Sequence, residues 1–483
     1  MKQFDAVVVG GGLLGCFAAR ELMRHDLTAL LLEQREDVCT GISKANTAII
    51  YPGYDHKPGT LKQAMTVRAN LGFDQLCSEL EVPFRRCGSL MISCGEKSDK
   101  VLQKKYEVGT ACGVPGLRMV SSEEAAEILP GLGSGVTCGI YAPSAGITDP
   151  WQLCYAAYEN ALANGCAVSL NTKLLAIRRD QGGYLLETTQ GEFSARAIIN
   201  CAGLFADKVH EMLFPPSVRI FPQGADYLLL ERESAELPVI FQQETEDGKG
   251  LTAVPTIGGT VMLGPTERDC EEELSAVSAS GMEEIITRQQ CILPGLNSGS
   301  VIRSFAAVRP LIRSVSWNGD AFVPDGKSIG SFAIEHPEPG FLSLIGIKTP
   351  GLTCSRELGS MAAESIAEYL NAKKRTDFCP NRKAIPSFRT LKMEERQSLI
   401  AEDPAWGRIL CRCEDISEAQ VLEAIARGAV TLDGIKRRCG AGLGICQGSF
   451  CQGKSAELLA KSLGISMEEV TLHGGDSRLG GGE

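Results

Sequence analysis

Residues 4–15 read Phe4-Asp-Ala-Val-Val-Val-Gly-Gly-Gly-Leu-Leu-Gly15, an apolar run that ends in a group of glycines. The β-branched residues predict a strand buried on both faces of a parallel sheet, and residues 16–24 predict the helix that follows it. In such a strand–turn–helix unit, Gly10 makes the tight turn, Gly12 lets a pyrophosphate approach the backbone, and Gly15 lets the helix pack on the strand. The stretch therefore predicts a Rossmann-like dinucleotide site, with the pyrophosphate at the positive end of the helix.

A second predicted strand, residues 27–32, ends at Glu33. A carboxylate about twenty residues after the glycines accepts hydrogen bonds from the adenosine ribose hydroxyls. It would also repel a 2′-phosphate. Together with the two strands, Glu33 makes an accidental glycine turn a poor explanation.

Composition narrows the class of protein. The chain has 483 residues, 44% of them hydrophobic and 22% charged, which predicts two to four globular units. A net charge of −11 argues against a nucleic-acid binder. No apolar run approaches the roughly 18–20 residues that span a bilayer, and the N-terminus reads as a strand and not as a signal peptide. With 19 cysteines, we expect a cytoplasmic protein whose thiols stay free or hold metal.

Most of the cysteines lie singly among apolar residues and are interpreted as small buried hydrophobes. Four others, Cys411, Cys413, Cys446 and Cys451, lie beside glycines that let the backbone fold tightly round an ion. Four such thiols can enclose an iron–sulfur cluster. Structural zinc also takes four thiolates, although the Cys-x-Cys spacing is tight for it, and a disulfide pair is the remaining alternative. The nearby Lys436, Arg437 and Arg438 would either offset the charge of a cluster or form a solvated face.

Further motifs lie along the rest of the chain: Ser43-Lys-Ala-Asn46, Pro58-Gly-Thr-Leu-Lys62, Asn200–Asp207, Pro255-Thr256, Leu263-Gly-Pro-Thr266, Arg309-Pro310 and Pro350-Gly-Leu-Thr353. With them, the chain resembles the glycine oxidase/D-amino-acid oxidase superfamily of FAD enzymes. Within it, the likeness is nearest to anaerobic glycerol-3-phosphate dehydrogenase large subunits and their 2-hydroxyglutarate dehydrogenase relatives. The C-terminal cysteines resemble the bacterioferritin-associated ferredoxin-like [2Fe–2S] domain.

The resemblance implies an α/β fold with a discontinuous, Rossmann-like FAD-binding domain, residues 1–75, 150–215 and 320–372. A mostly antiparallel β substrate domain, residues 76–149 and 216–319, would roof the flavin. Residues 227–231 and 259–264 read independently as strands outside any βαβ repeat. A linker, residues 373–405, would lead to a small helical [2Fe–2S] module, residues 406–483.

The resemblance also implies the cofactor residues. For FAD these are Gly10, Gly12, Leu13, Leu14, Gly15, Glu33, Gln34, Ser43, Asn46, Thr47, Ala202, Gly203, Asp207, Pro350, Gly351, Leu352 and Thr353. For the [2Fe–2S] cluster they are Cys411, Cys413, Cys446 and Cys451, and Cys439 is interpreted as an extra thiol, with a role as an alternative ligand left open.

An anionic substrate needs a fixed cation. Arg309 is the first candidate, because its planar fork suits carboxylate or phosphate and the relatives use the matching arginine; the alternative is a structural salt bridge. Lys348 is the second candidate. Relatives commonly place a histidine after the Ser-Lys-Ala-Asn segment, where this chain has Tyr51, and the nearest histidine is His56. Either side chain is a candidate for taking the hydroxyl proton, Tyr51 only with a strongly lowered pKa.

The resemblance predicts an FAD-dependent dehydrogenase that oxidises glycerol 3-phosphate or a 2-hydroxy acid. Electrons would leave through the [2Fe–2S] cluster to a partner subunit, a quinone or another carrier, and peripheral membrane association stays open. Two alternatives remain. One is oxidation of a secondary amine or imino acid, such as an opine or proline derivative; the other is a non-catalytic electron-relay subunit.

Overall fold

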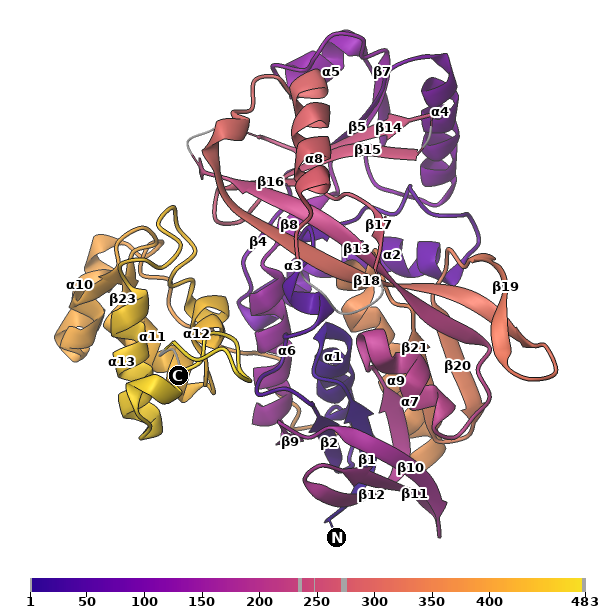
Figure 1. Cartoon of the computed structure of the whole chain (residues 1–483), viewed down its shortest axis with the longest axis vertical. Coiled ribbons are helices and arrows are strands. Elements are labelled where there is room, and N and C mark those ends of the chain that lie inside the picture. Colours follow the sequence, from indigo (N-terminus) through magenta and orange to yellow (C-terminus); the bar gives the residue numbers. More distant parts are fainter. Residues whose placement is uncertain (1, 233–236, 247, 271–275, 480–483) are drawn as a thin grey trace.

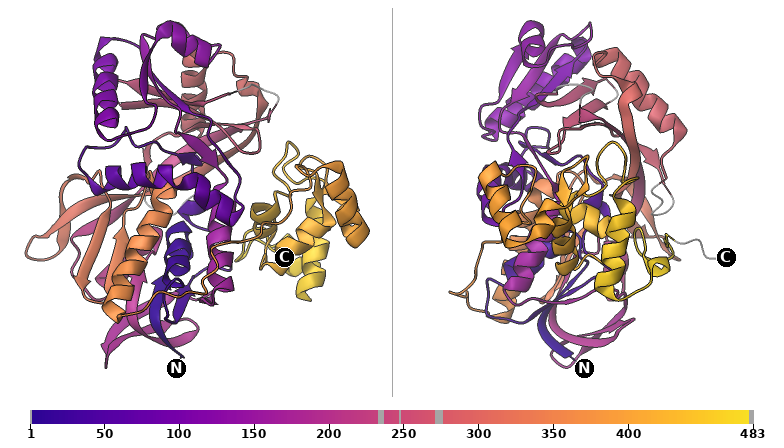
Figure 2. Two further views of the ribbon diagram at one scale, coloured as in Figure 1. Left: turned by 180° about the vertical axis from the view of Figure 1, so that it is seen from behind. Right: turned by 90° about the vertical axis from the view of Figure 1, so that its left-hand side faces the viewer.

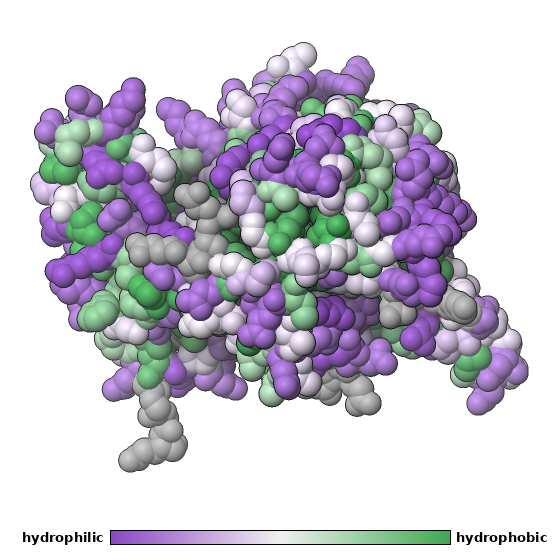
Figure 3. Space-filling view, turned by 90° about the horizontal axis from the view of Figure 1, so that it is seen from above, coloured by the Kyte–Doolittle hydropathy of each residue, from purple (hydrophilic) through white to green (hydrophobic). Residues whose placement is uncertain are grey.

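The computed structural model describes residues 2–232, 237–246, 248–270 and 276–479. The last four residues of the predicted [2Fe–2S] module, 480–483, lie outside this range. Two large sheets lie one above the other, and a small helical module stands beside them (Figure 1). Seen from above, this module forms a separate lobe, and most of the visible face is hydrophilic (Figure 3).

The lower sheet has eight strands and carries the predicted nucleotide turn. Its strands β1, β2, β9, β12 and β21 pair in parallel, and β10, β11 and β20 add antiparallel neighbours. Buried β-branched and leucine side chains fill β1 and β2, as expected for strands covered on both faces. The strands are β10 (Leu174–Asp180), β11 (Gly183–Thr188), β12 (Gly191–Asn200), β1 (Lys2–Val9), β2 (Ala29–Leu32), β9 (Ala167–Ser169), β20 (Ala333–Glu338) and β21 (Phe341–Ile345).

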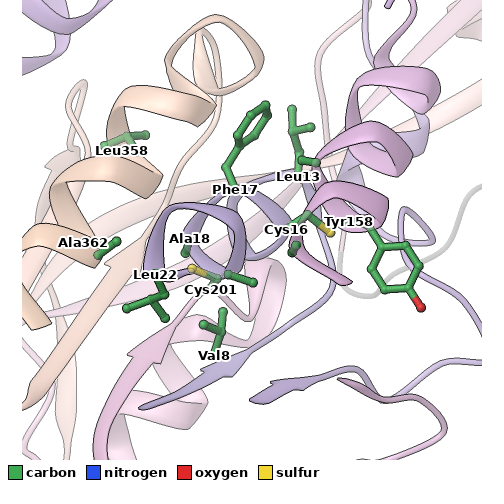
Figure 4. Packing of buried hydrophobic residues seen from close by; sticks show 14 of the residues in the cluster. Val8, Leu13, Cys16, Phe17, Ala18, Leu22, Tyr158, Cys201, Leu358 and Ala362 are labelled. Carbon is green, nitrogen blue, oxygen red and sulfur yellow. The ribbon is translucent and has the colours of Figure 1, made fainter. Parts of the chain in front are cut away.

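Three helices, α1 (Leu13–Leu22), α6 (Pro150–Ala163) and α9 (Gly351–Leu370), pack on one another over this sheet. Figure 4 shows the core that they form, with Phe17 and Leu22 of α1 between the strand residue Val8 and the α9 residue Leu358. Gly359 permits the close approach of α9, because a Cβ at this position would lie 2.9 Å from the backbone of Phe17. The core thus holds the N-terminal end of α1 firmly at the sheet edge.

The upper sheet is ten-stranded and mostly antiparallel. Its longest pair is β13 with β18, in a register from Val218 opposite Ser314 to Leu230 opposite Val301. Helices α4 (Glu96–Ala111), α5 (Ser122–Ile128) and α8 (Ala279–Ile292) cover it. The strands are β19 (Phe322–Ser328), β18 (Val301–Trp317), β13 (Val218–Leu230), β16 (Val261–Gly264), β15 (Gly248–Pro255), β14 (Ile240–Thr245), β5 (Ser89–Ser93), β7 (Cys138–Ala142), β6 (Arg118–Ser121) and β17 (Arg268–Asp269).

The strand β19 belongs to this upper sheet, although we placed the boundary of the FAD-binding domain at residue 320. It pairs with β18 as the return arm of a hairpin, which the resemblance did not reveal. Between the two large sheets lie a small three-stranded sheet and short helices. They are β3 (Ile49–Ile50), β8 (Gly146–Thr148), β4 (Phe84–Arg85), α2 (Leu61–Leu71), α3 (Phe73–Leu80) and α7 (Ala206–Glu211).

The predicted linker is more structured than expected. Its first part runs along α6, where Asn160 and Asn164 donate side-chain hydrogen bonds of 2.9–3.1 Å to the carbonyl of Cys379, and its second part forms α10 (Met393–Glu402). Figure 2 shows this linker and the C-terminal module from behind and from one side. The module contains β22 (Ile409–Cys411), β23 (Ile416–Ser417), α11 (Glu418–Ala426), α12 (Leu432–Cys439) and α13 (Gln452–Leu463), which share a small apolar core. Within the described ranges, no helix has both the length and the apolarity that a membrane span needs.

Candidate active site and cluster site

A cavity of about 1070 Å³ begins at the turn between β1 and α1 and extends to the underside of the upper sheet. At the upper end of the 300–1,000 Å³ typical of ligand pockets, it has room for a dinucleotide and a small substrate. Most of the residues predicted to bind FAD line it: Gly10, Gly12, Leu13, Leu14, Glu33, Gln34, Ser43, Asn46, Thr47, Ala202, Gly203, Pro350, Gly351 and Leu352.

The glycine turn is shaped for close backbone approach. Gly10 has a φ of +106°, and a Cβ there would lie 2.5 Å from the carbonyl oxygen of Cys201. Gly12 is the N-cap of α1, so the N–H groups of the first helical turn, which have no acceptor within the helix, begin at the cavity wall. A helix N-terminus of this kind favours a pyrophosphate.

The Glu33 carboxylate closes the same end of the cavity. It accepts hydrogen bonds from the backbone N–H of Gly11 at 2.6 Å and of Arg35 at 2.8 Å. Burial raises the pKa of this carboxyl, while the two backbone hydrogen bonds oppose that shift. Nearby, the Ser43 hydroxyl accepts from the backbone N–H of Leu13 at 2.9 Å. These residues fit the adenosine and pyrophosphate parts of FAD. The carboxylate suits the ribose hydroxyls, and the backbone N–H groups at the start of the helix suit the phosphates.

Three of the predicted FAD residues, Gly15, Asp207 and Thr353, lie outside the cavity lining and make structural contacts instead. A Cβ on Gly15 would lie 1.8 Å from the Gly10 carbonyl oxygen, so this glycine lets α1 pack on the turn. The Asp207 carboxylate accepts from the backbone N–H of Ile220 at 2.9 Å and thereby ties α7 to β13. The Thr353 hydroxyl accepts from the backbone N–H of Tyr51 at 3.0 Å. The last two contacts join distant segments, which local motifs do not reveal.

The four predicted substrate-end residues, Arg309, Lys348, Tyr51 and His56, all line this one cavity. Arg309 lies on β18 opposite Gln223 of β13. One terminal nitrogen, Nη2, is 3.2 Å from a carboxylate oxygen of Glu267. Its Nε is buried, and within the described residues it has no hydrogen-bond partner. Because a buried guanidinium donor is costly to leave unpaired, this geometry favours ligand binding over a purely structural salt bridge.

Sequence reasoning missed the role of Tyr227 in this cavity, because it was interpreted only as a strand residue. Its ring lines the cavity and stacks on Phe305 at 4.9 Å between centroids. Burial raises the pKa of its hydroxyl to about 12, so Tyr227 stays protonated at neutral pH and can donate a hydrogen bond.

The four predicted cluster cysteines form two pairs. The Sγ atoms of Cys413 and Cys446 are 3.6 Å apart, and the Cys451 thiol interacts with that of Cys411 and is the first cause that lowers its pKa. Within the described residues, no three His, Cys, Asp or Glu side chains are grouped to hold a single metal ion. In a [2Fe–2S] cluster, however, two protein ligands bind each iron. Two cysteine pairs are therefore the arrangement that such a cluster requires.

The surroundings lower the thiol pKa of one member of each pair, Cys411 and Cys446, and raise that of the other member, Cys413 and Cys451. The hydrogen bond from Cys451, followed by backbone hydrogen bonds at Gly442 and Glu414, lowers the pKa of Cys411 to about 6, and the thiolate is the form that binds metal. Cys439 differs, because burial raises the pKa of its thiol to about 12 and its Sγ donates to the carbonyl of Ile435. It is thus an extra thiol outside the two pairs.

Two residues of the basic run before the cluster loop, Arg437 and Arg438, do not form the solvated face considered from the sequence. They are 5% and 3% exposed. Arg438 pairs instead with Asp37, in the loop after β2. The run therefore joins the C-terminal module to the lower sheet.

Known protein families match both the FAD-binding part and the C-terminal cysteine module of the chain. The family model described as "FAD dependent oxidoreductase" matches residues 5–365, and the model "BFD-like [2Fe-2S] binding domain" matches residues 409–461. The glycerol 3-phosphate dehydrogenase of Caloramator mitchellensis is 36% identical, and the match covers 97% of this chain and 96% of that protein. The mitochondrial L-2-hydroxyglutarate dehydrogenase of Homo sapiens is 29% identical, over 55% of this chain and 61% of that protein.

Among solved structures, the FAD-bound L-α-glycerophosphate oxidase of Mycoplasma pneumoniae has a TM-score of 0.70. It is 22% identical and covers 79% of this chain and 99% of its own. The fold and the two sites thus define a two-cofactor flavoprotein. The chain belongs to the FAD dependent oxidoreductase family and is an FAD-dependent dehydrogenase with a C-terminal [2Fe–2S] domain. The predicted resemblance, fold class and two cofactors are confirmed.

Proposed function

We propose that this dehydrogenase oxidises a small alcohol that carries a phosphate or a carboxylate, with glycerol 3-phosphate as the first candidate. The observation that carries the proposal is the buried, unmatched Nε of Arg309 in the cavity wall, where the described residues leave it without a hydrogen-bond partner. An oxyanion bound in the fork of this side chain would satisfy that donor. The near-full-length relative named glycerol 3-phosphate dehydrogenase favours phosphate over carboxylate.

The other residues of this end of the cavity then have distinct roles. Lys348 adds a second positive charge for the anion, and Tyr227, which remains protonated, donates to a substrate oxygen. Tyr51 or His56 takes the proton of the substrate hydroxyl. FAD, when bound, supplies the two-electron acceptor, and the protein orients the substrate toward it.

Electrons leave, we propose, through the loop that carries the cluster ligands Cys446 and Cys451. The apolar neighbours of these ligands, Ile445 and Phe450, are 60% and 84% exposed. Such a patch beside a redox centre suits a docking partner, and we propose a partner subunit, a quinone or another carrier in the cytoplasm as the acceptor. The proposal leaves room for peripheral association with a membrane.

The test is anaerobic mixing of the FAD-loaded protein with single donors while the flavin absorbance is followed. The panel contains glycerol 3-phosphate, 2-hydroxyglutarate, lactate, proline, hydroxyproline and sarcosine. Rapid bleaching by glycerol 3-phosphate, at a rate that saturates with concentration, is the expected result. Bleaching by an amine alone would replace the proposal with oxidation of a secondary amine or imino acid, for which Tyr51 in place of a histidine is the supporting observation. No bleaching by any donor would favour an electron-relay subunit.

A further inference from the structure

A buried ion pair joins the C-terminal module to the nucleotide-binding half of the chain. The two terminal nitrogens of Arg438 donate to the two carboxylate oxygens of Asp37 at 2.5 and 2.8 Å. Asp37 is 1% exposed and Arg438 is 3% exposed. Tyr155 of α6 supports the pair, since its hydroxyl donates to Asp37 at 3.1 Å and its ring lies under the Arg438 guanidinium at 4.0 Å. A two-pronged, desolvated pair of this kind holds one geometry and loses much if either partner moves.

On one side, the pair acts on the loop that shapes the nucleotide site. Asp37 lies between Glu33 and Ser43, and its carboxylate also accepts from the backbone N–H of Val38 at 2.9 Å. The next residue, Cys39, donates its backbone N–H to the carbonyl of Gly11 at 3.0 Å, and Gly11 in turn donates to Glu33 at 2.6 Å. Three successive contacts therefore lead from Asp37 to the glycine turn and to the carboxylate proposed to bind the ribose.

On the other side, the pair acts on the cluster loop. Arg438 lies in the last turn of α12, which ends at Gly440 in a left-handed conformation with a φ of +87°. Two residues further on, Gly442 packs against the segment between the ligands Cys446 and Cys451, since an added Cβ there would lie 3.5 Å from the Cα of Gly448. Gln152 of α6 donates to the carbonyls of Arg437 and Arg438 at 3.2 and 2.5 Å and thereby holds the helix end in place. The position of α12 thus determines where the cluster loop begins.

We propose that the binding of FAD and of the [2Fe–2S] cluster is energetically coupled through Asp37 and Arg438. FAD orders the nucleotide loop on the Asp37 side of the ion pair, and the cluster orders its own loop on the Arg438 side. Through the ion pair, the binding of one cofactor then favours the loop conformation that binds the other. Both residues are positioning residues, since neither lines the cavity nor ligates the cluster. Such coupling is reciprocal by thermodynamic necessity. It predicts that loss of the cluster weakens FAD binding and that loss of FAD weakens binding of the cluster by the same factor.

The test uses the full chain, freed of FAD, in cluster-loaded form and after removal of iron with an anaerobic chelator. The dissociation constant of FAD is measured in both forms by quenching of flavin fluorescence. We expect removal of the cluster to raise this constant about fivefold or more in the wild type. In Asp37→Asn the ratio should fall to about one. The matched control is Arg427→Gln, because Arg427 also joins the module to α6, through Glu159 at 2.9 Å, but is remote from the nucleotide loop. This control should keep the wild-type ratio.

A ratio of one in the wild type, or an undiminished ratio in Asp37→Asn, overturns the proposal. If Asp37→Asn does not fold, the wild type alone still decides through the reverse measurement. At a fixed concentration of a competing chelator, the protein should retain more iron at equilibrium with FAD bound than without FAD, and equal retention overturns the coupling.

Discussion

The backbone N–H of Tyr51 donates a 3.0 Å hydrogen bond to the hydroxyl of Thr353, 302 positions further along the chain. The same hydroxyl donates to the carbonyl of Ile49 at 3.4 Å. Thr353 lies in the first turn of α9, and Tyr51 follows the short strand β3. One side chain thus ties the segment that contains Tyr51 to the first turn of α9, and both segments line the cavity.

Replacing Thr353 by valine should therefore destabilise the protein. The hydroxyl is buried, and its loss leaves the N–H of Tyr51 without an acceptor, which costs about 1–3 kcal/mol of unfolding free energy. Urea unfolding of the FAD-free protein measures the change. Thr353→Ser keeps the hydroxyl and should stay near the wild type; equal losses in the two variants would show that the methyl group and not the hydrogen bond matters.

Arg309→Ala should raise the Michaelis constant of the anionic substrate at least about tenfold, because a lost charged hydrogen bond costs about 1.5–3 kcal/mol. The measurement is steady-state oxidation with an artificial electron acceptor. Arg313→Ala is the control, since Arg313 lies on the same strand with its guanidinium over the Phe221 ring. Normal saturation in Arg309→Ala would remove this residue from the site.

Glu33→Gln should weaken FAD binding about tenfold. The amide that replaces the charged carboxylate is a weaker acceptor for the Gly11 N–H and for a ribose hydroxyl. Flavin fluorescence titration gives the dissociation constant, and Glu36→Gln, in the same loop, serves as the control. If both variants bind FAD as the wild type does, Glu33 does not contact the ribose.

Gly444→Ala should prevent assembly of the cluster. A Cβ at this position would lie 2.3 Å from the Cβ of Cys413, so the added methyl group must displace a ligand. Iron content and the visible absorbance of the purified protein measure the effect. Gly453→Ala is the matched change, since a Cβ there has open space within 4 Å; that variant should retain its cluster. A full cluster in Gly444→Ala would contradict the assignment of Cys413.

Asp149 should give the stability a distinctive pH dependence. Burial raises the pKa of its carboxyl from 3.8 to about 6, although the backbone N–H groups of Gln152 and Trp151 oppose the shift. The folded state therefore holds this proton more tightly than the unfolded state. The free energy of unfolding should fall, by up to about 3 kcal/mol, as the pH rises from about 4 to about 6, and the contribution should be constant outside that window.

Asp149→Asn isolates this contribution, because asparagine keeps an acceptor for the start of α6 but does not titrate in this range. Urea unfolding of both proteins at pH 4, 5, 6 and 7 gives the difference. The stability of the wild type relative to the variant should decline across the window. A difference that is independent of pH would mean that Asp149 has an ordinary pKa.

Much of the nucleotide site was predictable, because its parts are neighbours in the chain. The strand β1, the glycine turn and the start of α1 lie within residues 2–22, and each glycine has a local steric reason. The candidate cluster ligands could be proposed for a similar reason, since Cys411 lies close to Cys413 and Cys446 lies close to Cys451 in the sequence. The structure nevertheless pairs Cys413 with Cys446 and Cys411 with Cys451, across the two motifs.

The tertiary structure decided the contacts between distant segments. The sequence did not reveal that the side chain of Asp207 binds the backbone N–H of Ile220 or that the side chain of Thr353 binds that of Tyr51. Neither partner lies in the same local motif. The same holds for Arg438, whose charge is neutralised by Asp37, 401 positions away. By itself the sequence determined the local backbone geometries and the chemistry of the ligands. The positions of the buried charges and hydroxyls depend on which distant surfaces pack together, and only the folded chain brings those partners within hydrogen-bonding distance.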